Sequence, residues 1–226
     1  YAIFAGDGND SLLVNYGASG GFFAFPIAFH GQGDIDSLSV DSGTFDDVIF
    51  SYDSAADNPG TAQSGTIDQD GTVITFTGLE PILYQSNAGN VTFNLPGAND
   101  DQGVLEDNIA ADGLLRLRSV TGEFEQTDFM LPTASLTINL GDDSGTFDVA
   151  SLDAGLAAIP ITVNGGEGAD TVTVSASVTH DVSLYGEAGD DTLSGGSGND
   201  LIEGGADNDV LSGNAGSDEL LGGDGL

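Results

Sequence analysis

Alternation of apolar and polar residues dominates this chain, whereas the 3.6-residue periodicity of amphipathic helices is almost absent. The apolar positions are rich in β-branched and aromatic residues, which pack well on a pleated surface. Glycine and polar residues separate the alternating runs, as they do between short strands. The pattern predicts an all-β protein, with strands at Leu38–Val40, Val48–Tyr52, Val73–Thr77, Val91–Leu95, Leu136–Leu140, Ile161–Val163, Val172–Val174 and Val182–Tyr185.

Two segments depart from simple alternation. Asp70-Gly71 lies between the alternating runs 66–68 and 72–77. A type I′ turn needs positive φ at both central residues, which this dipeptide tolerates, so we predict a β-hairpin here. Asp153–Ala158 is the one helix candidate, and it is too short to be stable alone.

The spacing of the predicted strands indicates stacked coils. From about Val91 onward the strands are roughly 20–45 residues apart, and the spacing shrinks to nine at the C-terminal end. This is typical of a solenoid whose coils become shorter. The N-terminal half is less regular and holds most of the aromatic residues. We expect Phe22, Phe23, Phe25 and Phe29 to form hydrophobic core or to cap the coil end, with a carbohydrate-stacking platform as the alternative.

The C-terminal segment is a run of nine-residue frames. From Gly186 it reads GEAGDDTLS, GGSGNDLIE, GGADNDVLS and GNAGSDELL before it breaks off at GGDGL, and an earlier copy, GGEGADTVT, starts at Gly165. Six residues of each frame are predicted to form a turn and three a strand, with the apolar eighth side chain pointing inward. The sixth residue is an aspartate and the eighth is aliphatic in every complete copy: Asp170, Asp191, Asp200, Asp209 and Asp218, with Val172, Leu193, Ile202, Leu211 and Leu220.

Two frames make one coil, so turns on the same side recur every 18 residues. This spacing predicts that Asp191 stacks over Asp209, and Asp200 over Asp218. Asp170 has no such partner 18 residues later and is predicted to be a poorer ligand. Stacked carboxylates repel one another unless a cation lies between them.

Frame-like segments also occur near the N-terminus. GDGNDSLL, at Gly6–Leu13, places Asp10 and Leu12 in the sixth and eighth positions. HGQGDIDSL, which starts at His30, has Asp36 one place late and is a degenerate match. We therefore expect the unit to begin and end with the same type of turn, as a unit repeated in tandem would.

A repeated segment supports that expectation, because SGTFDDV at residues 42–48 recurs as SGTFDVA at residues 144–150. The sequence starts at Tyr1 and stops in mid-frame at Leu226. We read both ends as cuts from a longer chain.

The charge composition narrows the function. The chain has 37 acidic residues, two arginines and no lysine, which gives a formal net charge of −35. This charge excludes a basic nucleic-acid-binding surface and argues against attraction to an anionic membrane. The sequence also has no apolar run of about 18 residues, which argues against a transmembrane helix. Cysteine is absent, so disulfides and zinc–thiolate sites are excluded. Self-repulsion of this size calls for cations, and Ca²⁺ prefers six to eight oxygen ligands.

The frames resemble the RTX (repeats-in-toxin, hemolysin-type) family, whose motif is G-G-x-G-x-D-x-U-x. The middle of the chain, at VITFTGLEPI and LTINLGDDSGTFDVASL, also resembles modules of very large bacterial surface proteins. The family resemblance implies a right-handed parallel β-helix ending in a calcium-binding β-roll, with several Ca²⁺ ions between same-side turns. It implies ligands from the side chains of Asp191, Asp200, Asp209 and Asp218, with Asp170 and Asp10 as further candidates, and from backbone carbonyls in the turns at Gly189, Gly195, Ser197, Gly198, Gly204, Ala206, Asp207, Gly213, Ala215 and Gly216.

Three positions depart from the motif. Glu187 and Asn214 occupy position two, and Asp207 occupies position four, where glycine is expected. Asparagine tolerates the left-handed conformation more readily than aspartate or glutamate. We therefore expect weaker calcium sites at the turns that contain Glu187 and Asp207. Acidic runs outside the frames, such as 99–101 and 141–143, are interpreted mainly as solvated turns.

The sequence gives little support to catalysis. A Ser–His–Asp triad would need His30 or His180, and His180 precedes Asp181 in a predicted strand, where neighbouring side chains face opposite sides. Arg116 and Arg118 are the only bases a polysaccharide lyase could use, and surface pairing with Glu123 or Glu125 is the simpler interpretation.

Together these features predict no enzyme but a calcium-stabilised structural module of a secreted or cell-surface bacterial protein. Such a module would be a spacer, an adhesin stalk or a filament subunit. We expect an irregular β-solenoid with a hairpin and an aromatic core over residues 1–160, continuous with a calcium β-roll over residues 161–226. Identical or tandem modules along the solenoid axis are the expected partners, and glycans are a further candidate. The alternatives are an accessory region of a secreted protease, lipase or lyase, and a carbohydrate-binding adhesin module.

Overall fold

The computed structural model describes residues 2–17, 26–31, 35–53, 64–79, 81–97, 102–109, 112–122 and 124–225. Within these residues the protein is all-β, with no helix, and its strands form one large and mostly parallel sheet. The predicted all-β class is therefore confirmed. Phe22, Phe23 and Phe25 lie outside the described residues, so their predicted role stays a prediction.

Every strand predicted from the alternating pattern is present, and many are longer than expected. The bounds are β1 (Ala2–Phe4), β2 (Ser11–Asn15), β3 (Ile27–His30), β4 (Ser37–Tyr52), β5 (Ser64–Gln69), β6 (Thr72–Thr77), β7 (Ile82–Asn94), β8 (Gln102–Glu106), β9 (Leu114–Ser119), β10 (Thr127–Met130), β11 (Ser135–Asn139), β12 (Thr146–Val149), β13 (Ile161–Glu167), β14 (Thr171–Val174), β15 (Val182–Ala188), β16 (Thr192–Ser194), β17 (Leu201–Ala206), β18 (Val210–Ser212) and β19 (Glu219–Asp224).

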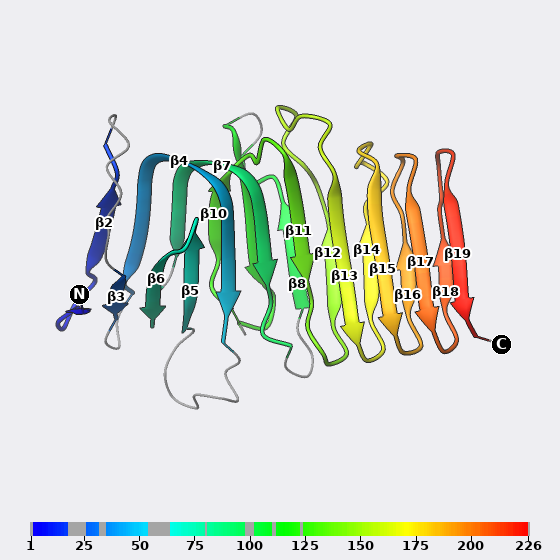
Figure 1. The fold of residues 1–226 in the computed structure, drawn as a ribbon, viewed down its shortest axis with the longest axis horizontal. Helices are drawn as coiled ribbons and strands as arrows, with labels where there is room; N and C mark the ends of the chain where they lie inside the picture. Colours follow the sequence, from blue (N-terminus) through cyan, green and yellow to red (C-terminus); the bar gives the residue numbers. More distant parts are fainter. Residues whose placement is uncertain are drawn as a thin grey trace.

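The second half of the chain is wound into coils, each made of two strands (Figure 1). β11, β13, β15, β17 and β19 pair in parallel as a first row, and β12, β14, β16 and β18 pair in parallel as a second row. The chain alternates between the rows, and the coils become shorter toward the C-terminus, as predicted. The first row continues from the end of β7, which pairs with β11. Paired residues on successive coils are 45 apart for Val91 and Leu136, 25 for Leu136 and Ile161, 21 for Ile161 and Val182, and 18 for Leu201 and Glu219.

The turns between the rows lie at two edges of the molecule. Edge A holds the turns that follow first-row strands, such as 186–191 and 204–209, at the bottom of Figure 1. Edge B holds the turns that follow second-row strands, such as 195–200 and 213–218, at the top of the same view. All turns of one kind are thereby stacked on the same side.

The core runs along the inside of the coils and changes in character along the axis. In the N-terminal half aromatic rings fill it: Phe50 stacks on Phe93 with 4.6 Å between the ring centroids, and Phe93 contacts Phe129 at 4.8 Å. Phe29 is also buried, as predicted. In the short C-terminal coils the inward residues are aliphatic, as at Leu193, which is fully buried.

Two antiparallel insertions interrupt the parallel stacking. β4, β5 and β6 form the first, and β5 and β6 are joined at Asp70-Gly71 with φ of 50° and 87°. The predicted type I′ hairpin is thus confirmed. β8, β9 and β10 form the second insertion. The candidate helix Asp153–Ala158 is instead a turn, in which the Leu156 amide donates to the Asp153 carbonyl.

The recurring SGTFD segments occupy different places in the fold. Residues 42–48 lie inside β4, where that strand bends around edge B (Figure 1). Residues 144–150 leave an edge A turn and enter β12. The repeated segment therefore does not mark equivalent turns, because the first copy bends within a strand and the second copy leads into a strand.

An asparagine ladder lies on the outer side of the first row. The side-chain Nδ2 of Asn139 donates to Asn94 Oδ1, and Asn139 Oδ1 accepts from Nδ2 of Asn164, both at 2.7 Å. The Asn139 side chain thus bonds to the coil before it and to the coil after it. Stacked amides of this kind stabilise parallel in-register strands.

Asn139→Ala is expected to lower the free energy of unfolding by about 1–2 kcal/mol, because it removes two amide hydrogen bonds that are partly shielded from solvent. Thr137→Ala is the matched control, since Thr137 lies on the same face of β11 without a place in the ladder. Urea unfolding at saturating calcium measures both variants. Equal losses in the two would contradict a stabilising ladder.

Candidate metal centre

Three aspartates form a column at edge A. The Asp170 amide donates to Asp191 Oδ1 at 2.8 Å, and the Asp191 amide donates to Asp209 Oδ1 at 3.0 Å. The column continues one coil further, because the Gly145 amide donates to Asp170 Oδ1 at 2.7 Å. The expectation that Asp170 lacks a partner is therefore wrong. Its coil is 21 residues long rather than 18, so its partner is Asp191.

A second column lies at edge B. The Asp200 amide donates to Asp218 Oδ1 at 3.0 Å, and the Val182 amide donates to Asp200 Oδ1, also at 3.0 Å. The predicted stacking of Asp191 with Asp209 and of Asp200 with Asp218 is thus confirmed. The columns differ at the second oxygen, because Asp200 Oδ2 accepts from the Gly196 amide at 2.8 Å.

The second oxygens of the edge A column have no donor among the described residues. Oδ2 of Asp170, Asp191 and Asp209 is buried in each case and makes no hydrogen bond. Asp170 and Asp191 are each only 1% exposed. A buried carboxylate oxygen without a donor is destabilising unless a cation satisfies it. Stacked hard oxygens with free lone pairs are the donor set that Ca²⁺ prefers, so these residues fit the ion that the sequence predicts.

Burial also changes how these carboxyl groups ionise. Desolvation raises the pKa of Asp191 to about 6, and the neighbouring charges of Asp170 and Asp209 add to the increase. Burial likewise raises the pKa of Asp170 and of Asp200, while hydrogen bonds from backbone amides oppose it. The ionised columns therefore destabilise the fold when no cation is bound.

A comparison with protein-family models matches the segment that contains these columns. The model described as the RTX calcium-binding nonapeptide repeat, in four copies, matches residues 181–202 and 194–225. This segment consists of RTX repeats. No curated protein sequence and no solved structure matches the chain. Asp191, Asp200, Asp209 and Asp218 lie inside the matched segment, whereas Asp170 and Asp10 lie outside it.

The turns of the RTX repeats bring the predicted carbonyl ligands to the same two edges. The first glycine of each frame packs directly against the frame aspartate, so that a Cβ at Gly186 would collide with Asp191 Oδ2 and with the carbonyl of Gly204. The candidates Gly189, Gly204, Ala206 and Asp207 lie in edge A turns, and Gly195, Ser197, Gly198, Gly213, Ala215 and Gly216 lie in edge B turns.

The three departures from the RTX motif keep the backbone conformation of glycine. Glu187, Asp207 and Asn214 have φ of 74°, 75° and 63°, which is the left-handed region. The turns therefore retain their shape, at a cost of about 1 kcal/mol for each non-glycine residue. The Asn214 amide also donates to the Gly195 carbonyl, so this predicted ligand already has a hydrogen-bond partner.

The fifth frame position forms an outer ladder that sequence reasoning missed. The backbone amide of Asn199 donates to Asp181 Oδ1 at 2.7 Å, and the backbone amide of Ser217 donates to the side-chain Oδ1 of Asn199 at 2.9 Å. At edge A the Asn208 amide donates to Asp190 Oδ1 at 2.8 Å. The signal in the sequence is the short polar residue in the fifth position of the four frames that start at Gly186. It joins successive coils outside the buried columns.

Asp10 lies far from the RTX repeats, in the edge A turn between β1 and β2. Its amide donates to Asp36 Oδ1 at 2.8 Å, so Asp10 and Asp36 stack as the frame aspartates do. A Cβ at Gly31 would lie 2.6 Å from Asp36 Oδ2, as one at Gly165 would from Asp170 Oδ2. Asp36 therefore takes the sixth position of a frame that starts at Gly31, and counting the frame from His30 was wrong by one residue.

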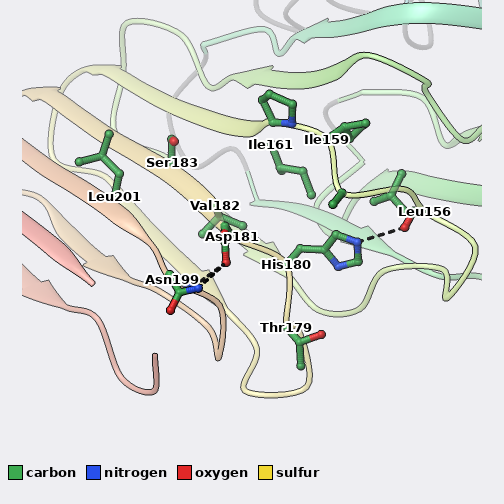
Figure 2. Close-up of a pocket in the computed structure, with 12 residues that line it drawn as sticks. Leu156, Ile159, Ile161, Thr179, His180, Asp181, Val182, Ser183, Asn199 and Leu201 are labelled. Carbon is green, nitrogen blue, oxygen red and sulfur yellow. Dashed lines mark hydrogen bonds between the residues drawn. The ribbon is translucent and has the colours of Figure 1, made fainter. Parts of the chain in front are cut away.

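Neither histidine is paired with a carboxylate in the described part of the chain. His30 Nδ1 bonds to Thr77 Oγ1 at 2.8 Å. His180 lines a groove of about 600 Å³ at edge B, where its Nε2 faces the Leu156 carbonyl at 3.2 Å (Figure 2). Asp181 turns to the other side and binds Asn199 (Figure 2). His180 and Asp181 lie in a turn rather than in a strand as expected, and they form no dyad.

No helix among the described residues is long and apolar enough to cross a membrane.

In calcium-free protein, stability is expected to rise as the pH falls from about 7 to about 4.5. The folded pKa of Asp191, about 6, lies above the unfolded value of about 3.9, so the folded state binds more protons between these values. The loss of stability caused by the ionised Asp191 carboxylate is complete above about pH 6, and it disappears as the carboxylate binds a proton at lower pH. With calcium the sign reverses, because protons compete with the ion. Thermal unfolding of dialysed protein over this range, with and without calcium, measures both slopes. A calcium-free stability that increases toward neutral pH would contradict this.

Proposed function

We propose that this chain is a calcium-stabilised structural module of a secreted or cell-surface bacterial protein. Its role is mechanical, as a spacer, adhesin stalk or filament subunit that folds when it meets extracellular Ca²⁺. The observation that carries the proposal is the column of Asp170, Asp191 and Asp209, whose buried Oδ2 atoms lack donors among the described residues. Calcium bound there supplies positive charge that offsets carboxylate repulsion.

Coupled folding follows from this arrangement. Where calcium is scarce, 37 acidic residues against two arginines favour an open chain that is suited to export. Where calcium is abundant, an ion that binds only the folded coils adds its binding free energy to their stability. In this proposal the aspartates hold the ion, and the glycines let neighbouring turns approach closely enough to share it.

The proposal also includes the finer organisation of the module. A right-handed coil continues through an irregular β-solenoid over 1–160 into the β-roll over 161–226. Identical or tandem modules stack along the axis, and what supports this is the parallel, in-register stacking of successive coils, which can continue from one module into the next.

A catalytic activity is not part of the proposed function. Support comes from the histidine environments, since neither ring contacts a carboxylate in the described residues. A role as the calcium-binding region of a secreted enzyme would place the chemistry elsewhere. A glycan-binding role would rest on Phe22, Phe23 and Phe25, which the structure does not describe.

Solution scattering tests the structural role. One chain, and two copies joined in tandem, are measured in calcium and after chelation. A rigid spacer predicts that the maximum dimension of the tandem pair is close to twice that of the single chain in calcium, and that both proteins expand without calcium as residues 165–225 unfold. Two copies that collapse onto each other in calcium, or shapes that do not respond to calcium, would refute the proposal.

A further inference from the structure

A cluster of three carboxylates lies at edge B, outside the RTX repeats. Asp107 directly follows β8, Asp112 precedes β9, and Asp153 lies in the turn after β12. One carboxylate oxygen from each lies within 4.8 Å of the other two. Ca²⁺ binds oxygen at about 2.3–2.6 Å, so two ligands on opposite sides of one ion are up to about 5 Å apart. The cluster therefore has the dimensions of a single coordination sphere.

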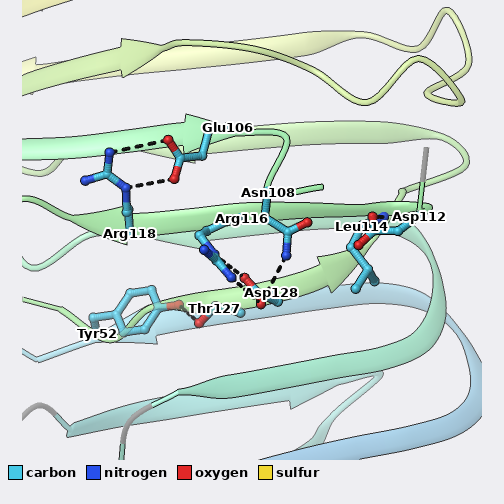
Figure 3. A network of polar contacts seen from close by, with 9 residues as sticks. All are labelled: Tyr52, Glu106, Asn108, Asp112, Leu114, Arg116, Arg118, Thr127 and Asp128. Atoms are coloured by element: carbon cyan, nitrogen blue, oxygen red, sulfur yellow. Dashed lines mark hydrogen bonds and ion pairs between the residues drawn. The ribbon is translucent and has the colours of Figure 1, made fainter. Parts of the chain in front are cut away.

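Neither arginine forms an ion pair with the cluster in the described structure, although the charge of Arg116 also acts on Asp112. The sequence contains two arginines and no lysine. Arg116 binds Asp128 through two hydrogen bonds of 2.6 and 2.9 Å, and Arg118 likewise forms a bidentate pair with Glu106 (Figure 3). These cross-strand pairs replace the predicted pairing with Glu123, which lies outside the described residues, or with Glu125.

Asp153 is buried, Asp107 is half-buried and Asp112 is exposed, and one buried oxygen of Asp107 has no donor in the described structure. Asp153 is 1% exposed and accepts only from two backbone amides, of Gly155 at 2.6 Å and Gly113 at 3.3 Å. Asp107 Oδ1 is buried without any hydrogen-bond partner. A buried carboxylate oxygen without a donor is destabilising unless a cation satisfies it. This oxygen is therefore the observation that points to a ligand.

A neutral donor accompanies the carboxylates. Asn108 donates its amide group to Asp128 at 3.3 Å, so its oxygen is turned away from that residue (Figure 3). That oxygen is also buried and without a hydrogen-bond partner in the described residues. Carboxylates combined with an amide oxygen are hard ligands, which suit Ca²⁺.

We propose that Asp107, Asp112 and Asp153 bind a calcium ion, with Asn108 Oδ1 as a further ligand. The site joins two connections that are about 40 residues apart in sequence, because Asp107 and Asp112 lie between β8 and β9 whereas Asp153 follows β12. It thereby fastens the antiparallel insertion of β8, β9 and β10 to the parallel coil that begins with β12. No glycine-rich frame contributes to it, so calcium acts on the first 160 residues as well as on the RTX repeats.

Calcium titration of the full chain by isothermal calorimetry tests the site through Asp107→Asn. This variant removes a charge while keeping the shape of the side chain, and Asp107 Oδ1 makes no hydrogen bond that would be lost. The expected result is one calcium ion fewer per chain than in the wild type. Asp148→Asn is the matched control, because Asp148 is exposed on neighbouring β12, and it should bind as many ions as the wild type.

A local readout separates this site from the RTX repeats. The amides of Gly113 and Gly155 donate to the Asp153 carboxylate, so their NMR signals should shift on calcium addition in the wild type and not in Asp107→Asn. The Gly145 amide, which donates to Asp170, should shift in both proteins. Unchanged stoichiometry in both Asp107→Asn and Asp112→Asn, with the same Gly113 and Gly155 shifts, would overturn the proposal and leave the RTX sites unaffected.

Discussion

Chelating calcium with EGTA at neutral pH is expected to unfold residues 165–225, and adding calcium back should restore their β-structure. The buried Oδ2 atoms of Asp170, Asp191 and Asp209 have no donor in the described structure, and burial raises the pKa of Asp191 to about 6. At neutral pH these carboxylates are ionised and stacked. Ions held between the coils offset a repulsion that the short aliphatic core of this segment cannot.

Circular dichroism and hydrogen exchange measure this transition. The far-ultraviolet β signal should fall after chelation, and amides such as those of Asp170 and Asp191, which donate to the next aspartate, should lose protection first. Monovalent salt at the same ionic strength is the control for simple screening. An unchanged spectrum after exhaustive EGTA treatment would refute calcium-coupled folding.

The N-terminal half is expected to respond less to chelation, because a large aromatic core stabilises it. Phe50, Phe93 and Phe129 are fully buried there and contact one another. Burial of one such ring contributes about 1.5–3 kcal/mol relative to exposure. Because of this difference in core, backbone amides of the N-terminal half should exchange more slowly than those of residues 165–225 after chelation.

The strand positions could be read from the sequence because side-chain alternation is a local property. The Asp70-Gly71 hairpin was equally local, since two positive φ values determine the turn. The coil spacing was also visible, because each nine-residue frame carries an aliphatic eighth residue, such as Leu193 and Ile202, which are buried. Local patterns therefore predicted the elements and the repeat, but not every partner across the coils.

Partners that depend on coil length were harder to predict. Asp170 was misjudged because an 18-residue period was applied to a 21-residue coil, whose three extra residues lie at edge B and leave edge A in register. Asp36 was misplaced by a frame counted one residue early. The cluster of Asp107, Asp112 and Asp153 has no sequence signature, since its members come from two separate connections, one before β9 and one after β12.

Gly186→Ala is expected to disrupt the edge A column, with a loss of about 1–3 kcal/mol in the free energy of unfolding. The added methyl group would collide with Asp191 Oδ2 and with the carbonyl of Gly204, which leaves no room for relaxation within a backbone turn. Displacement of this carboxylate should also weaken calcium binding. Thermal unfolding at saturating calcium and calorimetric titration measure the two effects.

Gly222→Ala is the matched control, because Gly222 occupies the same first frame position with no atom within 4 Å of an added Cβ. We expect its stability to stay within about 0.5 kcal/mol of the wild type. Gly222 lies in the last coil, so a third variant separates contact from location. Gly213→Ala, which begins the preceding frame, would place its methyl group against the Asp218 carboxylate and should weaken calcium binding although it lies near the same end. If all three substitutions left calcium affinity unchanged, close packing of the first glycine on the frame aspartate would not be what shapes these sites.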